Sequence, residues 1–185
     1  MNTAPRLAVL VTTLAVAMTI PVAAIAKPVS TYELKSSFVV DGYSGSVVVT
    51  VDEAGASDIH FQMSTFEMLD CDGAFGTVTS TWLAEGFADE VEFSVNRKLD
   101  AVVWIGTASV SVTVSTYCPD TGILEQVETT TGTFAFDGTS SQRVTRTRID
   151  GNRVLSSTLD VLVLSVPELS TVGVGQLTET ISKST

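Results

Sequence analysis

Residues 101–117 read AVVWIGTASVSVTVSTY, and apolar and polar side chains alternate through most of this segment. The polar residues from Ser109 to Ser115 share one parity. The apolar residues share the other: Val102, Trp104, Ala108, Val110, Val112 and Val114. Successive side chains of a strand point to opposite faces, so this period of two predicts a long β-strand with one buried face. Gly106 interrupts the pattern and indicates a bulge or a bend.

Similar segments lie on both sides of this strand. Pro119-Asp120-Thr121-Gly122 is a turn sequence, and it predicts a returning strand at residues 124–136. Upstream, the alternating segments 47–51 and 59–63 predict a hairpin. Downstream, Asp150-Gly151 lies between two strand-like runs and favours a hairpin with a type I′ turn.

The whole chain follows this pattern, and helical periodicity is nearly absent. Further strands are predicted within residues 32–40, 75–83, 91–95, 159–164 and 172–181. About nine or ten strands joined by short turns are typical of an all-β fold. We therefore expect a single antiparallel β-sandwich or β-barrel domain at residues 27–185.

The N-terminus carries the features of a secretory signal peptide. Arg6 precedes an apolar run at residues 7–20, and Ala24-Ile25-Ala26 offers a small-residue cleavage site. We predict that residues 1–26 are a signal peptide and that the protein is secreted, in the extracellular or cell-envelope space. The alternative is an uncut anchor, because residues 7–26 have about the length that crosses a bilayer. With cleavage, no integral membrane span is expected in the mature chain.

The net charge argues against some classes of partner. The chain has a formal charge of −11, and losing Arg6 with the signal peptide leaves nine basic and 21 acidic residues, or −12. Nucleic acids and anionic membrane surfaces attract proteins with a positive field, so neither is expected as a partner. A small molecule or an extracellular polymer remains open as a ligand.

The two cysteines fit an exported protein. Cys71 and Cys118 are the only ones, and a pair in an oxidising compartment usually forms a disulfide. The alternative is two separate buried thiols. One histidine and no CxxC pattern leave too few ligands for a zinc site, so no metal or cofactor is predicted.

No set of residues predicts catalysis. His60 is the single histidine and shares a strand face with Asp58, but no G-x-S-x-G motif supplies a nucleophile. Asp70-Cys71-Asp72-Gly73 resembles the start of a calcium loop, yet the twelfth position from Asp70 is not acidic. We interpret that segment as a solvated turn beside a disulfide cysteine.

Arginine is concentrated in one short region. Arg143, Arg146, Arg148 and Arg153 lie within eleven positions. Arg146 and Arg148 share a strand face, and Arg153 follows across the predicted hairpin, so Arg146, Arg148 and Arg153 are a candidate patch for an anion or an acidic glycan. The alternative is a solvated hairpin whose arginines protect the sheet edge from aggregation.

Residues 91–103, VEFSVNRKLDAVV, lead into the alternating strand and the Pro119-Asp120-Thr121-Gly122 turn. This order of a short strand, a basic-Leu step and an Ala-led strand resembles small uncharacterised secreted all-β proteins of actinobacteria. The resemblance covers the central third of the chain and implies an all-β fold and an exported setting. The resemblance assigns no function to any residue of this chain.

These observations favour a secreted, non-enzymatic β-domain that binds a partner or is associated with the envelope. One alternative is a β-barrel carrier of a small apolar ligand, which needs an unfilled interior. Another is an extracellular hydrolase that uses a pair of carboxylates, because two of the 21 acids could meet in a cleft.

Overall fold

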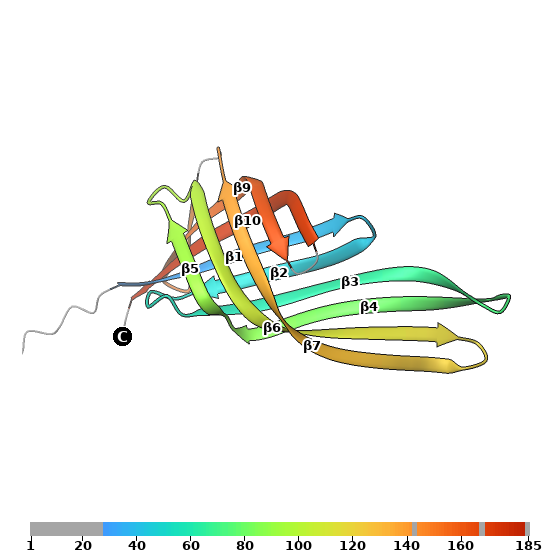
Figure 1. Ribbon diagram of the computed structural model, residues 1–185. Helices are drawn as coiled ribbons and strands as arrows, with labels where there is room; N and C mark the ends of the chain where they lie inside the picture. Colours follow the sequence, from blue (N-terminus) through green and yellow to red (C-terminus); the bar gives the residue numbers. More distant parts are fainter. Residues whose placement is uncertain (1–27, 142–143, 167–168, 184–185) are drawn as a thin grey trace, which may run out of the picture.

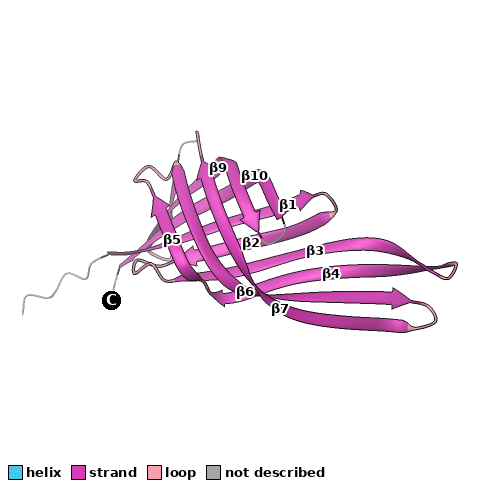
Figure 2. Ribbon diagram, in the orientation of Figure 1, coloured by secondary structure: helices cyan, strands magenta, loops and turns pink. Residues whose placement is uncertain are grey.

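The computed structural model describes residues 28–141, 144–166 and 169–183 (Figure 1). Within them it contains strands and turns but no helix (Figure 2). The strands are β1 (Pro28–Val40), β2 (Tyr43–Val51), β3 (Ser57–Cys71), β4 (Ala74–Phe87), β5 (Asp89–Val95), β6 (Ala101–Cys118), β7 (Gly122–Thr139), β8 (Thr145–Ile149), β9 (Asn152–Val166) and β10 (Leu169–Lys183). The all-β prediction is confirmed. The predicted signal peptide at residues 1–26 lies outside the described residues.

All ten strands belong to one antiparallel sheet. Its order is β10-β1-β2-β3-β4-β6-β7-β9-β8, with β5 beside β6. β9 also pairs with β10, which stands at the other end of this order, so the sheet is curled and one of its faces lies inside the curl. The ladder between β7 and β9 covers only Ala135 to Thr139, whereas β7 itself extends back to Gly122. The sheet is a single curled layer, so the two packed sheets of the predicted sandwich are not found among the described residues.

The core lies inside this curl. It is formed by the apolar parity of the long strands, including Val102, Trp104 and Val110 of β6, each at most 1 % exposed. The ring of Trp104 packs edge-on against Phe136, with 5.8 Å between their centroids. The alternation of residues 101–117 predicted one buried face. In the part of β6 that crosses the core, the apolar residues do form that face.

The irregularity indicated by Gly106 is found in the neighbouring strand. The ladder between β6 and β7 is continuous through Gly106, whereas the ladder between β5 and β6 shifts between Asp89 and Glu92. Two residues of β5 there oppose Gly106 alone, which is the arrangement of a β-bulge. Gly106 also makes room for a core side chain, because a Cβ atom would lie 2.7 Å from the ring of Trp104.

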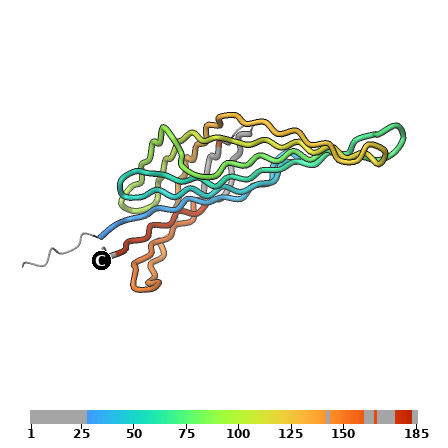
Figure 3. The backbone as a smooth tube through the Cα atoms, turned by 90° about the horizontal axis from the view of Figure 1, so that it is seen from below, coloured from blue at the N-terminus to red at the C-terminus, as the bar shows by residue number. Residues whose placement is uncertain are grey.

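Four strands continue beyond the core as an arm, which we define as residues 66–80 and 112–131 of β3, β4, β6 and β7 (Figures 1 and 3). β2 pairs with β3 only as far as Thr65, and β9 reaches β7 only from Ala135 onward, so both edges of the arm are unpaired. The pairing register puts six exposed apolar side chains on the outer face of the arm: Phe66, Met68, Phe75, Tyr117, Ile123 and Val127.

A disulfide fastens the end of the arm. Cys71 and Cys118 are bonded, with their Cα atoms 5.8 Å apart, and this confirms the predicted pair. The bond joins the turn between β3 and β4 to the turn between β6 and β7. Gly76 of β4 lies beneath it, because a Cβ atom there would meet Cys71 Sγ and the carbonyl oxygen of Tyr117.

Gly76→Ala is expected to hinder formation of this disulfide, because the added methyl group occupies the space of the Cys71 sulfur atom and of a backbone oxygen. Thiols counted under denaturing conditions after oxidative refolding should rise severalfold over the unsubstituted protein. Gly73→Ala is the matched control: it strains a turn residue at φ +87°, but no atom lies within 4 Å of its Cβ position. Equal thiol counts in the two variants would contradict the expectation.

Candidate functional site

A cavity of about 650 Å³ opens at the end of the sheet opposite the arm. Three parts of the chain line it: the loop between β5 and β6, residues 140–141 and 144 between β7 and β8, and the β8–β9 hairpin. The lining residues are Arg97, Lys98, Leu99, Asp100, Ser140, Ser141, Val144, Arg146 and Leu155. The first two segments are joined directly, because the backbone N–H of Ser140 donates to the carbonyl of Asp100 at 2.9 Å.

The loop between β5 and β6 turns two basic side chains outward. Asn96 organises it: its side-chain oxygen accepts from the backbone N–H of Asp100 at 3.0 Å, and its amide donates to the Asp100 carboxylate. Leu99 is only 3 % exposed and anchors the loop in the core. Arg97 and Lys98 precede this anchor and remain exposed, so the loop presents two cations at the rim of the cavity.

The β8–β9 hairpin supplies the remaining cations. Asp150 and Gly151 have φ angles of 49° and 83°, which fits the type I′ turn predicted from their sequence. Arg146 pairs with Leu155 and Arg148 with Arg153, so the three arginines share the face on which Leu155 is buried. Like charges directly opposite each other repel, and the Arg148–Arg153 pair is such a case.

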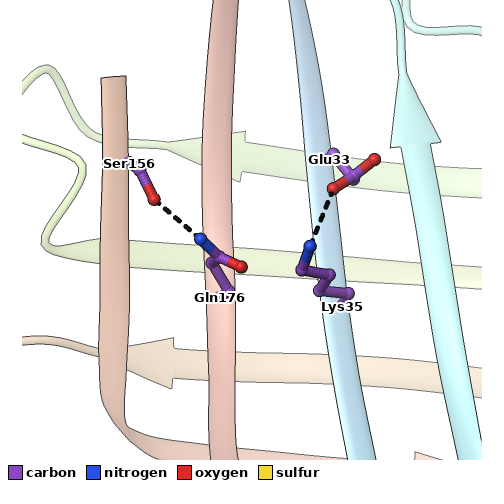
Figure 4. Close-up of polar contacts among 4 residues, drawn as sticks. All are labelled: Glu33, Lys35, Ser156 and Gln176. Atoms are coloured by element: carbon purple, nitrogen blue, oxygen red, sulfur yellow. Dashed lines mark hydrogen bonds and ion pairs between the residues drawn. The ribbon is translucent and has the colours of Figure 1, made fainter. Parts of the chain in front are cut away.

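These five cations have no acidic partner among the described residues. The side chains of Arg97, Lys98, Arg146, Arg148 and Arg153 make no ion pair or hydrogen bond there. They are five of the nine basic residues in 27–185. Lys35 behaves differently, because its Nζ lies 3.6 Å from the Glu33 carboxylate on the same strand (Figure 4). Asp100 is the one acid among the lining residues, and its carboxylate accepts a hydrogen bond from the Asn96 side-chain amide.

The arrangement is suited to binding an anion. Guanidinium groups bind carboxylate and phosphate through paired, charge-assisted hydrogen bonds. The cavity volume lies in the range of ligand sites, and Leu99, Val144 and Leu155 give it an apolar part. The hairpin places Arg146, Arg148 and Arg153 on one face, and that they bind an anion stays a prediction. Arg143 lies outside the described residues.

Sequence reasoning missed Arg97 and Lys98. They lie about fifty positions before Arg146, in a loop that no pattern connects with the hairpin. The adjacent basic residues after the 91–95 strand were the one available signal. The contact between Ser140 and Asp100 that brings the two regions together is a tertiary contact, so spacing along the chain could not reveal it.

A second cavity, of about 640 Å³, lies between β1, β5 and the turn from β2 to β3. Tyr32 and Phe93 meet there with ring centroids 5.1 Å apart, and the Tyr32 hydroxyl donates to Glu179 Oε1 at 3.1 Å. Burial, and after it the negative charge of Glu179, raise the pKa of Tyr32 above its usual value. Asp52 and Glu53 also line this cavity, so an anion would be repelled from it.

The other residues weighed in the sequence have ordinary surroundings. His60 is exposed, and its Nδ1 lies 3.0 Å from the carboxylate of Glu85 on β4. The calcium-like segment forms a tight turn in which the N–H of Gly73 donates to Asp70 Oδ1 at 2.8 Å. No group of three or more metal-ligating side chains occurs within the described part of the chain.

A search of protein-family models finds none that matches this chain, and a search of curated proteins finds no match either. In residues 28–141, 144–166 and 169–183, no helix has the length and apolar character needed to span a bilayer.

Proposed function

We propose that this protein is an exported binding domain that holds an anionic ligand in the basic cavity and acts by binding, without catalysis. One observation carries the proposal: five cations that have no acidic partner in the described part of the chain gather at one end of a protein whose formal charge is −11. Keeping like charges together costs electrostatic energy, and a bound anion offsets that cost. The signal-like N-terminus and the disulfide support export.

The ligand we propose carries several anionic groups. Arg97, Lys98 and Arg146 line the cavity itself, while Arg148 and Arg153 continue along the same face of the hairpin. Such a row is longer than one carboxylate or phosphate group, so it suits a chain of repeated anionic groups, such as an acidic extracellular polymer. Secretion, which the N-terminal sequence and the resemblance to secreted actinobacterial proteins imply, is a prediction within this proposal.

The filled interior favours this reading over an internal carrier of an apolar ligand. Trp104, Phe61, Phe134 and Phe136 occupy the centre of the curl, and none is more than 1 % exposed. The rings of Phe61 and Phe134 lie 5.0 Å apart and pack edge to face. A ligand inside the curl would therefore need to displace core side chains.

Lys98→Glu/Arg146→Glu is expected to weaken polyanion binding by roughly 10- to 100-fold, because each of the two reversals replaces an attraction of up to about 1 kcal/mol between exposed charges with a repulsion. Isothermal titration of residues 27–185 with linear polyphosphate and with poly-L-glutamate measures this loss. Binding by the unsubstituted protein should also weaken as salt increases, because the contacts are exposed charges.

The control is Lys35→Glu, which reverses one charge on β1, away from the cavity, and so makes half the change of charge of the cavity variant. We expect it to alter affinity by less than about threefold, the scale of an exposed charge at a distance. If Lys35→Glu weakens binding as much as the cavity variant, attraction is general and the proposed site is wrong.

A further inference from the structure

The tip of the arm consists of the turn between β3 and β4 and the turn between β6 and β7. Its charge is opposite to that of the basic cavity, which is the cavity lined by Arg97, Lys98 and Arg146. Asp70, Asp72 and Asp120 are exposed, and each lies within two residues of Cys71 or Cys118. The disulfide therefore holds the three carboxylates of two separate turns in one group. The arm as a whole, residues 66–80 and 112–131, contains six acidic residues and no Lys, Arg or His.

Apolar side chains accompany these carboxylates. Phe75 pairs directly opposite Asp70 and is 82 % exposed, and Ile123 beside the second turn is 67 % exposed. The cavity has the complementary composition, with cations at its rim and Leu99, Val144 and Leu155 in its wall. The tip and the cavity therefore carry opposite charges, and each also presents apolar side chains.

The two surfaces lie at opposite ends of the same two strands (Figure 1). The cavity is built by the loop before β6 and the connection after β7, whereas the tip is built by the end of β6 and the start of β7. Each strand has 18 residues, which is about 60 Å along its path, and both strands bend between the core and the arm (Figure 1). The arm extends away from the core, so its tip does not reach the cavity of its own chain and is free to meet that of another.

We propose that the basic cavity receives the acidic arm tip of a second copy of this chain, so that copies associate head to tail. This inference rests on the proposed function, because it names the anionic partner of the same cavity. Tip and cavity are different surfaces, so the contact is heterologous and each added copy leaves one tip and one cavity free. Open-ended chains of copies follow.

Two complementary variants test the proposal. The tip variant is Asp72→Asn/Asp120→Asn, in which Asn suits the positive φ of position 72 and Asp70 keeps its turn hydrogen bond. The cavity variant is Lys98→Glu/Arg146→Glu. Each variant alone should be monomeric in sedimentation velocity, with self-association weakened at least tenfold. Mixed in equal amounts, they retain one intact tip and one intact cavity, so they should form a 1:1 dimer and nothing larger.

The unsubstituted protein, residues 27–185 in oxidised form, should form species whose mean mass increases with protein concentration and decreases with added salt. A monomer at all concentrations in low salt would overturn the proposal. A mixture of variants that stays monomeric, or a variant that assembles like the unsubstituted protein, would also overturn it. Circular dichroism of each variant shows whether the sheet is intact.

Polyanion titration separates this inference from the proposed function. Polyphosphate should compete with the arm tip and return the assembled protein to monomers. If polyphosphate binds the cavity while the protein is always monomeric, the cavity site stands and head-to-tail association is wrong. If neither binding nor association depends on Lys98 and Arg146, both proposals are wrong.

Discussion

Trp104→Ala is expected to lower the free energy of unfolding by about 3–5 kcal/mol, the range for truncating a large buried aromatic side chain. Trp104 has no exposed surface and packs edge-on against Phe136. Its Nε1–H donates to Ser57 Oγ at 3.1 Å, and Ser57 is itself only 3 % exposed. The substitution therefore leaves both a void and a buried hydroxyl without its partner.

Urea unfolding followed by circular dichroism measures this loss. Val103→Ala is the control, because Val103 is the next residue of β6 but faces outward and is 36 % exposed. We expect the control to cost less than about 1 kcal/mol. Trp104→Phe should fall between the two, since it keeps an apolar ring but removes the donor to Ser57. Equal losses for Trp104→Ala and Val103→Ala would show that the inner face has been assigned wrongly.

The second large effect is expected from Cys71→Ser/Cys118→Ser, which should lower the free energy of unfolding by about 4 kcal/mol under the chain-entropy model. The bond joins residues 47 positions apart, and its loss gives the unfolded chain more conformations. In the folded protein it also leaves the two turns of the arm tip unlinked. Amide hydrogen exchange should therefore accelerate most in residues 66–80 and 112–131.

Reduction supplies the control for this variant. A thiol reductant should lower the stability of the unsubstituted protein to nearly that of the double variant and leave the double variant unchanged. If the reductant destabilises both proteins equally, the effect does not arise from the Cys71–Cys118 bond. Loss of the bond should also weaken head-to-tail association, because the carboxylates of Asp72 and Asp120 are no longer held together.

Local sequence signals were sufficient for the elements themselves. Alternation marked β6, and the Asp150-Gly151 pair marked the turn between β8 and β9. These signals act between neighbours along the chain, so the sequence carries them directly. Partners across the sheet are different: the sequence shows that Asp58 and His60 share a strand face, but only the β3–β4 ladder shows that Glu85 lies opposite His60.

The sequence by itself determined an all-β chain with one cysteine pair, and it indicated the arginine patch. Only the tertiary structure decided that Arg97 and Lys98 join that patch. It also decided that Phe66 and Met68 lie exposed on the arm, whereas Phe61 and Met63 of the same strand are buried in the core. The physical reason is that a period of two shows that a strand has two faces. What covers each face depends on strands distant in the chain.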